Sequence, residues 1–214
     1  MKITIDHSII KALLVFAAKN DLRYYLNSIA IDATRDRVAL VATDGHMLMS
    51  IAVPASDVDN KLTGEYIISR ADLEAVKPMK AGKHALPITI EITEPAPTPD
   101  PDRPGVMIKH NTTYKITGLT SVTNTLVDGK FPDWRRVIPP TLSGEVAHFN
   151  LELMTRLNDA RKALSVDWHN VVIHHNGRSA AQVTGLGNES IVIVMPMRVD
   201  SDDKPMIPAW AKLA

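Results

Sequence analysis

The chain has 214 residues, enough for one large domain or two small ones with a substantial core. Hydrophobic residues make up 45% and charged residues 22%, and the balance of 24 basic and 24 acidic residues argues against a polybasic nucleic-acid binder. The absence of cysteine excludes disulfides and thiolate chemistry. No signal peptide follows Met1, and the longest apolar run, 12–18, is too short to span a bilayer. We therefore expect a cytoplasmic protein.

The first part of the chain predicts a strand, a helix and three further strands. The helix is expected from about Ser8 to Lys19, because apolar residues recur at helical spacing and Asp6 or Ser8 can cap its start. Asp44-Gly45 is typical of the tight turn of a β-hairpin. The expected strands are 2–5, 25–33, 37–43 and 46–53.

The second part predicts the same order of elements. Ser69 and Asp72 form a capping pattern before a short helix that Pro78 ends. Residues 94–104 contain five prolines and predict a stiff, exposed loop. A turn at 111–112 is expected to join the last two strands. The expected strands are 65–68, 88–92, 105–110 and 113–123.

The third part begins with an expected strand and an Asn150 cap. Leu153, Leu157, Ala160 and Leu164 recur at helical spacing and predict the apolar side of a helix. Asn176-Gly177 is a strong hairpin signal. Residues 200–214 are interpreted as a tail. The expected strands are 145–149, 170–175, 179–184 and 190–195.

Three β-α-β-β-β repeats predict an α+β architecture in which helices cover one face of antiparallel sheets. A repeated unit that cannot bury its own apolar face must pair with another. Because three is an odd number, one unit has no internal partner. We therefore expect the chain to self-associate.

The stretch 127–139, VDGKFPDWRRVIP, fits neither a helix nor a strand, because Gly129 and Pro132 interrupt any regular period. It is too apolar for a solvated linker. One interpretation is a connector held against a surface between two folded units. The other is an ordinary loop that buries Trp134.

Candidate catalytic and metal-binding residues are few. Asp44 and His46 share a hairpin turn, where the backbone alone explains the Asp-Gly pair. His174 and His175 would point to opposite faces of a strand, so neither they nor His169 predict a shared metal ion. We expect no catalytic residue, no metal site and no cofactor, and a hydrolase using Asp44 and His46 is the remote alternative.

Two motifs suggest binding. Tyr24-Tyr25 after Arg23 could stack on bases or sugar-phosphate, although one core and one surface tyrosine is the simpler interpretation. The methionines of 195–198 suit an adaptable peptide-binding surface, and a strand end with buried methionine is the alternative.

Taken together, four segments resemble the bacterial sliding clamp, the β subunit of DNA polymerase III, in the order in which that family carries them. Residues 1–140 resemble its complete middle domain, and 141–199 resemble the second half of its last domain, leaving 200–214 as the tail. Residues 94–104 and the tail have no counterpart in the resemblance. The four segments are 22–27, 42–46, 127–139 and 194–198.

The resemblance implies two sites and no catalysis. One is a cleft for short peptides of replication or repair proteins, and the other is an inner face that contacts duplex DNA. Met47, Leu153 and Val199 depart from the family pattern. The implied cleft residues are Leu26, Thr43, Gly45, His46, Leu48, Pro132, Arg136, Val137, Asn150, Ile193, Met195, Pro196, Met197 and Arg198. The implied DNA-facing residues are Asn20, Arg23, Tyr24 and Tyr25, with Lys11, Lys77, Arg156 and Lys162 added from their helix positions.

The expected function is that of a shortened DNA processivity factor of phage or mobile-element origin. It would self-associate as a tetrameric ring or a dimer, since four chains with three units each supply the twelve units of a family ring. Its partners would be double-stranded DNA, peptides of DNA polymerase or repair proteins, and a clamp loader. The alternative is a decoy or regulator of the host clamp that does not encircle DNA.

Overall fold

The computed structural model describes residues 1–59, 62–81, 84–103, 105–167, 171–187, 189–198 and 208. His169, Val199 and all of the expected tail except Pro208 lie outside these residues. The remaining expectations can be compared with the structure element by element.

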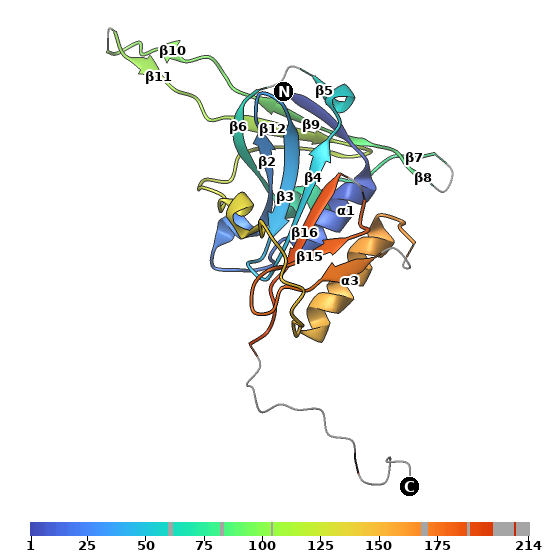
Figure 1. Ribbon diagram of the computed structural model, residues 1–214. Helices are drawn as coiled ribbons and strands as arrows, with labels where there is room; N and C mark the ends of the chain where they lie inside the picture. The colour runs from blue at the N-terminus through green and yellow to red at the C-terminus, as the bar shows by residue number, and fades with distance from the viewer. Residues whose placement is uncertain are drawn as a thin grey trace.

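The central element is a seven-stranded antiparallel sheet, with α1 and α3 packed against one face (Figure 1). Strand β16 of the third unit pairs with β4 of the first, with Val192 opposite Met49. This pairing makes one continuous sheet across the two units. In the order of the sheet the strands are β14 (Val172–His174), β15 (Ala181–Thr184), β16 (Ser190–Val194), β4 (Met47–Val53), β3 (Val38–Thr43), β2 (Ser28–Ala33) and β6 (Gly64–Ser69), and the helices are α1 (His7–Phe16) and α3 (Leu151–Ala163).

A second, five-stranded antiparallel sheet combines three strands of the second unit, which follow α2 (Arg70–Ala75), with two strands of the first unit. The two units exchange their first strands: β1 of the first unit pairs with β9, and β6 of the second pairs with β2. The first two units are therefore interlocked. In the order of the sheet the strands are β13 (Ser121–Thr125), β12 (Thr113–Thr117), β9 (Ile88–Thr93), β1 (Lys2–Ile5) and β5 (Val58–Asp59).

Helices α1, α2 and α3 each begin at a predicted cap. The side chains of Asp6, Ser69 and Asn150 accept hydrogen bonds from backbone N–H groups two residues later. Helix α1 ends at Phe16, three residues before the predicted Lys19. The prediction was wrong there because the chain turns away to hydrogen-bond the carbonyl of Leu26 through the N–H of Ala18.

The hairpin predicted at 111–112 is wrong. Strand β12 pairs instead with β13, across the turn at 118–120, because that register buries Tyr114 and Ile116 in the five-stranded sheet. The proline-rich stretch contributes one strand, β10, to a separate two-stranded arm that projects from the body, and β11 just after it is the other strand (Figure 1). Its exposed position agrees with the prediction. The short strands outside the two large sheets are β7 (Lys80–Ala81), β8 (His84–Ala85), β10 (Thr98–Pro99) and β11 (Met107–Ile108).

The strand predicted at 145–149 is also wrong, since only His148 forms a bridge there, with Met197. A strand needs a paired strand along its length, whereas this segment also contacts the turn after β14, where the N–H of Gly177 donates to the carbonyl of Glu145 and the N–H of Ala147 donates to the ring of His175. The other strands of the third unit form as predicted, with the hairpin at Asn176-Gly177.

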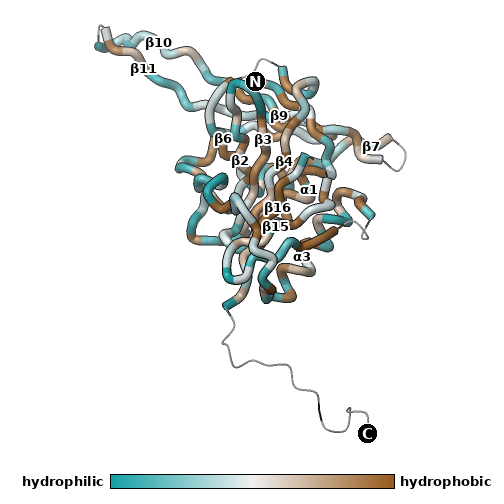
Figure 2. The backbone as a smooth tube through the Cα atoms, viewed as in Figure 1, coloured by the Kyte–Doolittle hydropathy of each residue, from teal (hydrophilic) through white to brown (hydrophobic). Residues whose placement is uncertain are grey.

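The core lies on both faces of the seven-stranded sheet. On the helical face, Leu13 and Phe16 of α1 pack with the strand residues. On the opposite face, Phe131 and Trp134 of the connector cover Val41 and neighbouring residues. Every residue of β3 is consequently buried, and Figure 2 shows hydrophobic colour along the central strands and α1. Two short 3₁₀ turns, η1 (Tyr24–Leu26) and η3 (Trp134–Val137), lie beside this second face, and η2 (Ala55–Asp57) precedes β5.

Candidate functional site

A cleft of about 200 Å³ opens on the outer face of the seven-stranded sheet, which is the face opposite α1 and α3. It lies between β4, β16 and the connector 127–139. Its lining is mainly apolar, and it is smaller than the roughly 300–1,000 Å³ of pockets that hold drug-sized ligands. Such a cleft suits one or two apolar side chains of a peptide. Nine of the fourteen predicted cleft residues line it: Leu26, Thr43, Gly45, His46, Leu48, Pro132, Val137, Ile193 and Met195.

The turn after β3 forms one wall of the cleft. Thr43 fixes it, because its hydroxyl donates to the carbonyl of Met47 at 2.7 Å and accepts from the N–H of Gly45 at 3.0 Å. Gly45 has a φ of +94°, and a Cβ there would lie 3.3 Å from a guanidinium nitrogen of Arg23. The positive φ favours glycine here, whereas the exposed Arg23 side chain could shift to accommodate a Cβ.

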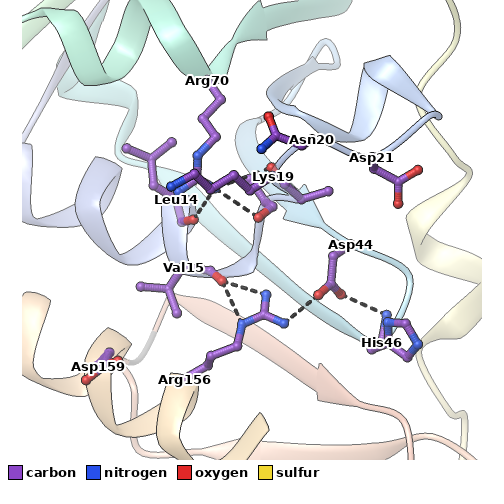
Figure 3. Close-up of a pocket in the computed structure, with 12 residues that line it drawn as sticks. Leu14, Val15, Lys19, Asn20, Asp21, Asp44, His46, Arg70, Arg156 and Asp159 are labelled. Atoms are coloured by element: carbon purple, nitrogen blue, oxygen red, sulfur yellow. Dashed lines mark hydrogen bonds and ion pairs between the residues drawn. The ribbon is translucent and has the colours of Figure 1, made fainter. Parts of the chain in front are cut away.

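Asp44 also holds this turn, through its side chain (Figure 3). One carboxylate oxygen accepts from the N–H groups of His46 at 2.8 Å and Met47 at 2.9 Å, and the other pairs with Arg156 at 2.5 Å. Burial acts to raise the pKa of Asp44, but the hydrogen bonds from Arg156 and the two N–H groups outweigh it, so the pKa is lowered. Its carboxylate is occupied by these partners, which argues against a catalytic pair with His46.

Arg156 connects this turn to the helices. It donates to the carbonyl of Val15 at 2.6 Å, while Arg70 donates to the carbonyl of Leu14 at 2.7 Å (Figure 3). These carbonyls belong to the last turn of α1, where backbone acceptors lack helical partners and cations are favourable. Arg156 therefore joins α3, the end of α1 and the cleft turn.

Five predicted cleft residues do not line this cleft. Asn150 uses its side chain to cap α3, and Arg136 lies exposed on η3. The other three are Pro196, Met197 and Arg198.

Four lining residues were not predicted: Arg23, Met47, Asp133 and Trp134. Trp134 was interpreted as packing alone. Its indole N–H donates to Asp32 at 2.8 Å, which holds the ring against the sheet and leaves it 7% exposed. Its position in a stretch with the predicted Pro132 and Val137 was the signal that could have identified it.

Residues 4–133 match the family described as DNA polymerase III beta subunit, central domain. This match covers more than half of the chain. The protein belongs to the bacterial sliding-clamp family.

Curated relatives and solved structures agree. The chain is 30% identical to the beta sliding clamp of Pseudomonas putida over 124 residues, which are 57% of this chain and 28% of that protein. It is 30% identical to the Vibrio cholerae beta sliding clamp over 149 residues, 69% of this chain and 33% of that one. The chain thus spans about a third of the length of the curated relatives that it matches.

A crystal structure of the sliding clamp from Pseudomonas aeruginosa has the same fold, with a TM-score of 0.62 at 19% identity, over 93% of this chain and 66% of that one. The subunit from Borrelia burgdorferi, solved in complex with a natural product, gives 0.59 at 11% identity, over 94% of this chain and 65% of that one. The predicted clamp fold is confirmed.

The residues predicted to face DNA fall into two groups. Near the cleft, Tyr24 is 55% exposed and its ring meets that of Tyr25 edge to face, with centroids 5.8 Å apart. Arg23 beside them pairs with Asp21, whose pKa the hydrogen bonds from Arg23 lower to about 2. Asn20 lies nearby with a φ of 61°.

On the helices and just after α2, Lys11, Lys77 and Lys162 are exposed. Arg156 differs from them, because it is engaged by Asp44 and the carbonyl of Val15. The part of this clamp-family chain that the structure describes contains neither a group of three potential metal ligands nor a helix long and apolar enough to cross a membrane.

Proposed function

We propose that this protein is a non-catalytic, cytoplasmic clamp-family tether that holds short peptides of DNA polymerase or repair proteins in its cleft. The observation that carries the proposal is the convergence of nine predicted positions on one cleft. These come from parts of the chain that lie far apart in sequence, from Leu26 to Met195. Residues 1–140 would form the complete clamp-like domain and 141–199 the half domain.

The cleft's chemistry supports a peptide with an apolar anchor. Leu26, Leu48 and Ile193 form a buried floor, and Met195 lies 37% exposed at the rim. Methionine adapts its shape to different side chains.

Peptide binding can be tested with Met195→Glu, which places a charge in the apolar cleft. Met107→Glu is the matched control, because Met107 is also exposed but lies on the projecting arm. Fluorescence anisotropy with a labelled peptide from a clamp-binding polymerase should show at least about tenfold weaker binding for Met195→Glu. The control should bind as the unaltered protein does. Equal affinity of the two variants would remove the cleft assignment.

The same proposal includes self-association and contact with duplex DNA through Lys11, Lys77, Lys162 and the exposed Tyr24. Four chains would supply the twelve units of a family ring, and a clamp loader is the partner that would open one. The zero net charge predicts a weak, salt-sensitive grip on phosphates. A decoy that binds clamp partners without encircling DNA is the rival, and a monomer in sedimentation at high concentration would favour it over the ring.

A further inference from the structure

The projecting arm of β10 and β11 carries a run of exposed apolar residues near its tip (Figure 1). Val106, Met107 and Ile108 are 41%, 54% and 38% exposed, and no other three consecutive large hydrophobic residues are exposed in the described part of the chain. Such a run is uncommon on a soluble surface unless it binds something. A two-stranded ribbon is also only marginally stable in water, and further strands would stabilise it. The arm therefore has the properties of a docking strand.

Contacts within the arm hold its tip in shape. The N–H of Asp100 donates to the carbonyl of Val106 at 2.8 Å. The carboxylate of Asp100 is buried, and it accepts from the N–H of Asp102 at 3.0 Å and from the guanidinium of Arg103 at 2.7 Å. Because these contacts order the tip before a partner binds, association of the arm loses less conformational entropy than association of a disordered loop.

The same hydrogen bonds show which backbone groups of the arm face outward. In the ladder of β10 and β11, Asp100 donates to Val106, and the next pair, Pro99 and Met107, lies in the same register. Bonded and non-bonded pairs alternate along an antiparallel ladder. The backbone groups of Pro99 and Met107 therefore point away from each other, toward the two outer edges of the arm.

The two outer edges differ in what they offer to a further strand. On the β10 edge, Pro97 and Pro99 lie two positions apart, so both place a ring nitrogen where an N–H donor would be. On the β11 edge, Met107 and Lys109 keep their N–H groups, and neither group has a partner among the described residues. Within the arm, β11 is therefore the strand that can pair further.

We propose that β11 pairs antiparallel with β11 of a second copy of this chain, about a twofold axis at Met107. This names one surface for the self-association in the proposed function and rests on it. The strand order would be β10 and β11 of one copy, then β11 and β10 of the other. Both outermost edges are then the proline edges, so the sheet ends at two arms. A strand of an unrelated protein would instead leave its own far edge open, which favours a second copy as the occupant.

The proposed register joins apolar residues. The two Met107 residues exchange backbone hydrogen bonds across the axis, and their side chains meet on one face. On the other face, Val106 of each copy lies opposite Ile108 of the other. Lys109 lies opposite Gly105, so no like charges are opposed. The exposed run thus becomes the contact between the two copies.

Charge exchange at Met107 tests this contact by sedimentation. Met107→Glu opposes two carboxylates across the axis, and Met107→Lys opposes two ammonium groups. Each variant alone should therefore sediment at no more than half the mass of the unaltered protein's assembly. An equal mixture of the two variants should regain the unaltered mass, because a glutamate then faces a lysine. The arm itself should keep its shape, since the Met107 side chain is exposed.

Leu119→Glu and Leu119→Lys are the matched controls. Leu119 is also an exposed apolar residue, but it lies on the turn between β12 and β13. These variants should keep the unaltered mass, both alone and mixed. The same loss and recovery at Leu119 as at Met107 would show a general effect of surface charge and overturn the pairing of the arms.

The remaining outcomes separate the possible failures. If the Met107 variants keep the unaltered mass, or if their mixture does not regain it, the pairing of β11 about a twofold axis is wrong and the chain self-associates through another surface. A mass of 23.5 kDa for the unaltered protein at all concentrations overturns both the pairing and self-association. Neither result bears on the cleft, because Met107→Glu should keep its peptide affinity and Met195→Glu should keep the unaltered mass.

Discussion

Asp44 shows how one residue connects the fold to the cleft. The Asp-Gly turn was predicted from two adjacent residues, because its backbone preference is local. The ion pair with Arg156 was not predicted, because the two residues lie 112 positions apart and neither carries a local signal for the other. Arg156 had been assigned to the DNA-facing surface from its helix position alone.

The lowered pKa of Asp44 predicts acid sensitivity of this junction. A carboxylate whose pKa is lower in the folded state adds stability above its unfolded pKa of about 3.9. That stability is lost as the pH falls from about 4 through the lower, folded pKa. Arg156→Met removes the charged partner and should reduce the free energy of unfolding at pH 7 by about 1–3 kcal/mol.

Urea unfolding at pH 7 and at pH 3 checks this prediction. The difference between the unaltered protein and Arg156→Met should shrink at the lower pH, because Asp44 is then increasingly protonated in both. Lys162→Met on the same helix is the control, since Lys162 and Asp159 form an exposed pair at 3.5 Å. Such pairs contribute less than about 1 kcal/mol. An equal loss of unfolding free energy in the two variants would contradict the conclusion that the pair of Arg156 and Asp44 stabilises the fold more than an exposed pair does.

At the scale of elements, the connector 127–139 determines where the cleft forms. Its interpretation as a segment held against a surface agrees with the burial of Phe131 and Trp134 on the outer face of the sheet. Asp32 accepts from the Trp134 indole and also pairs with Arg135, whose guanidinium lies 4.3 Å from the Trp134 ring. These contacts place Pro132 and Val137 along the cleft.

Trp134→Leu should therefore weaken both the fold and the cleft. Loss of ring volume and of the indole hydrogen bond should lower the free energy of unfolding by about 2–4 kcal/mol. Trypsin should cut faster after Arg135 and Arg136, because the connector is no longer held against the sheet. Limited proteolysis and urea unfolding measure the two effects. Leu142→Ala is the control, because Leu142 is 37% exposed and should change the free energy of unfolding by no more than about 0.5 kcal/mol. If trypsin cut Trp134→Leu no faster than this control, the anchoring role of Trp134 would be contradicted.

Sequence periodicity predicted some elements better than others. Helix α3 was predicted because Leu153, Leu157 and Ala160 recur at helical spacing and become its buried side. The hairpin at 111–112 was misassigned because the alternation across 105–123 does not show which segment is the neighbour. That choice depends on burial of Tyr114 beside β9, a contact between distant parts of the chain.

At the scale of the whole molecule, the repeat count predicted an unpaired unit, but the exchange of first strands could not be predicted. Strand β1 precedes α1 in sequence yet belongs to the other sheet. Local propensity is the same for either sheet, so only the assembled units reveal the exchange.

Closure of a ring predicts topological retention on DNA. With zero net charge, direct contacts through Lys11, Lys77 and Lys162 should weaken steeply as salt rises. A closed ring would remain on a nicked circular plasmid at about 0.5 M NaCl, where the Debye length is only a few ångströms and exposed charges are screened.

Chains mixed with the plasmid while dilute and then concentrated would close around it during assembly, and gel filtration would separate bound from free protein. Cutting the plasmid once should release the protein, because a ring slides off an open end whereas a protein bound by contacts stays on a duplex of unchanged charge. Release by salt alone, to the same extent from circular and linear DNA, would mean that the chain contacts duplex DNA without surrounding it.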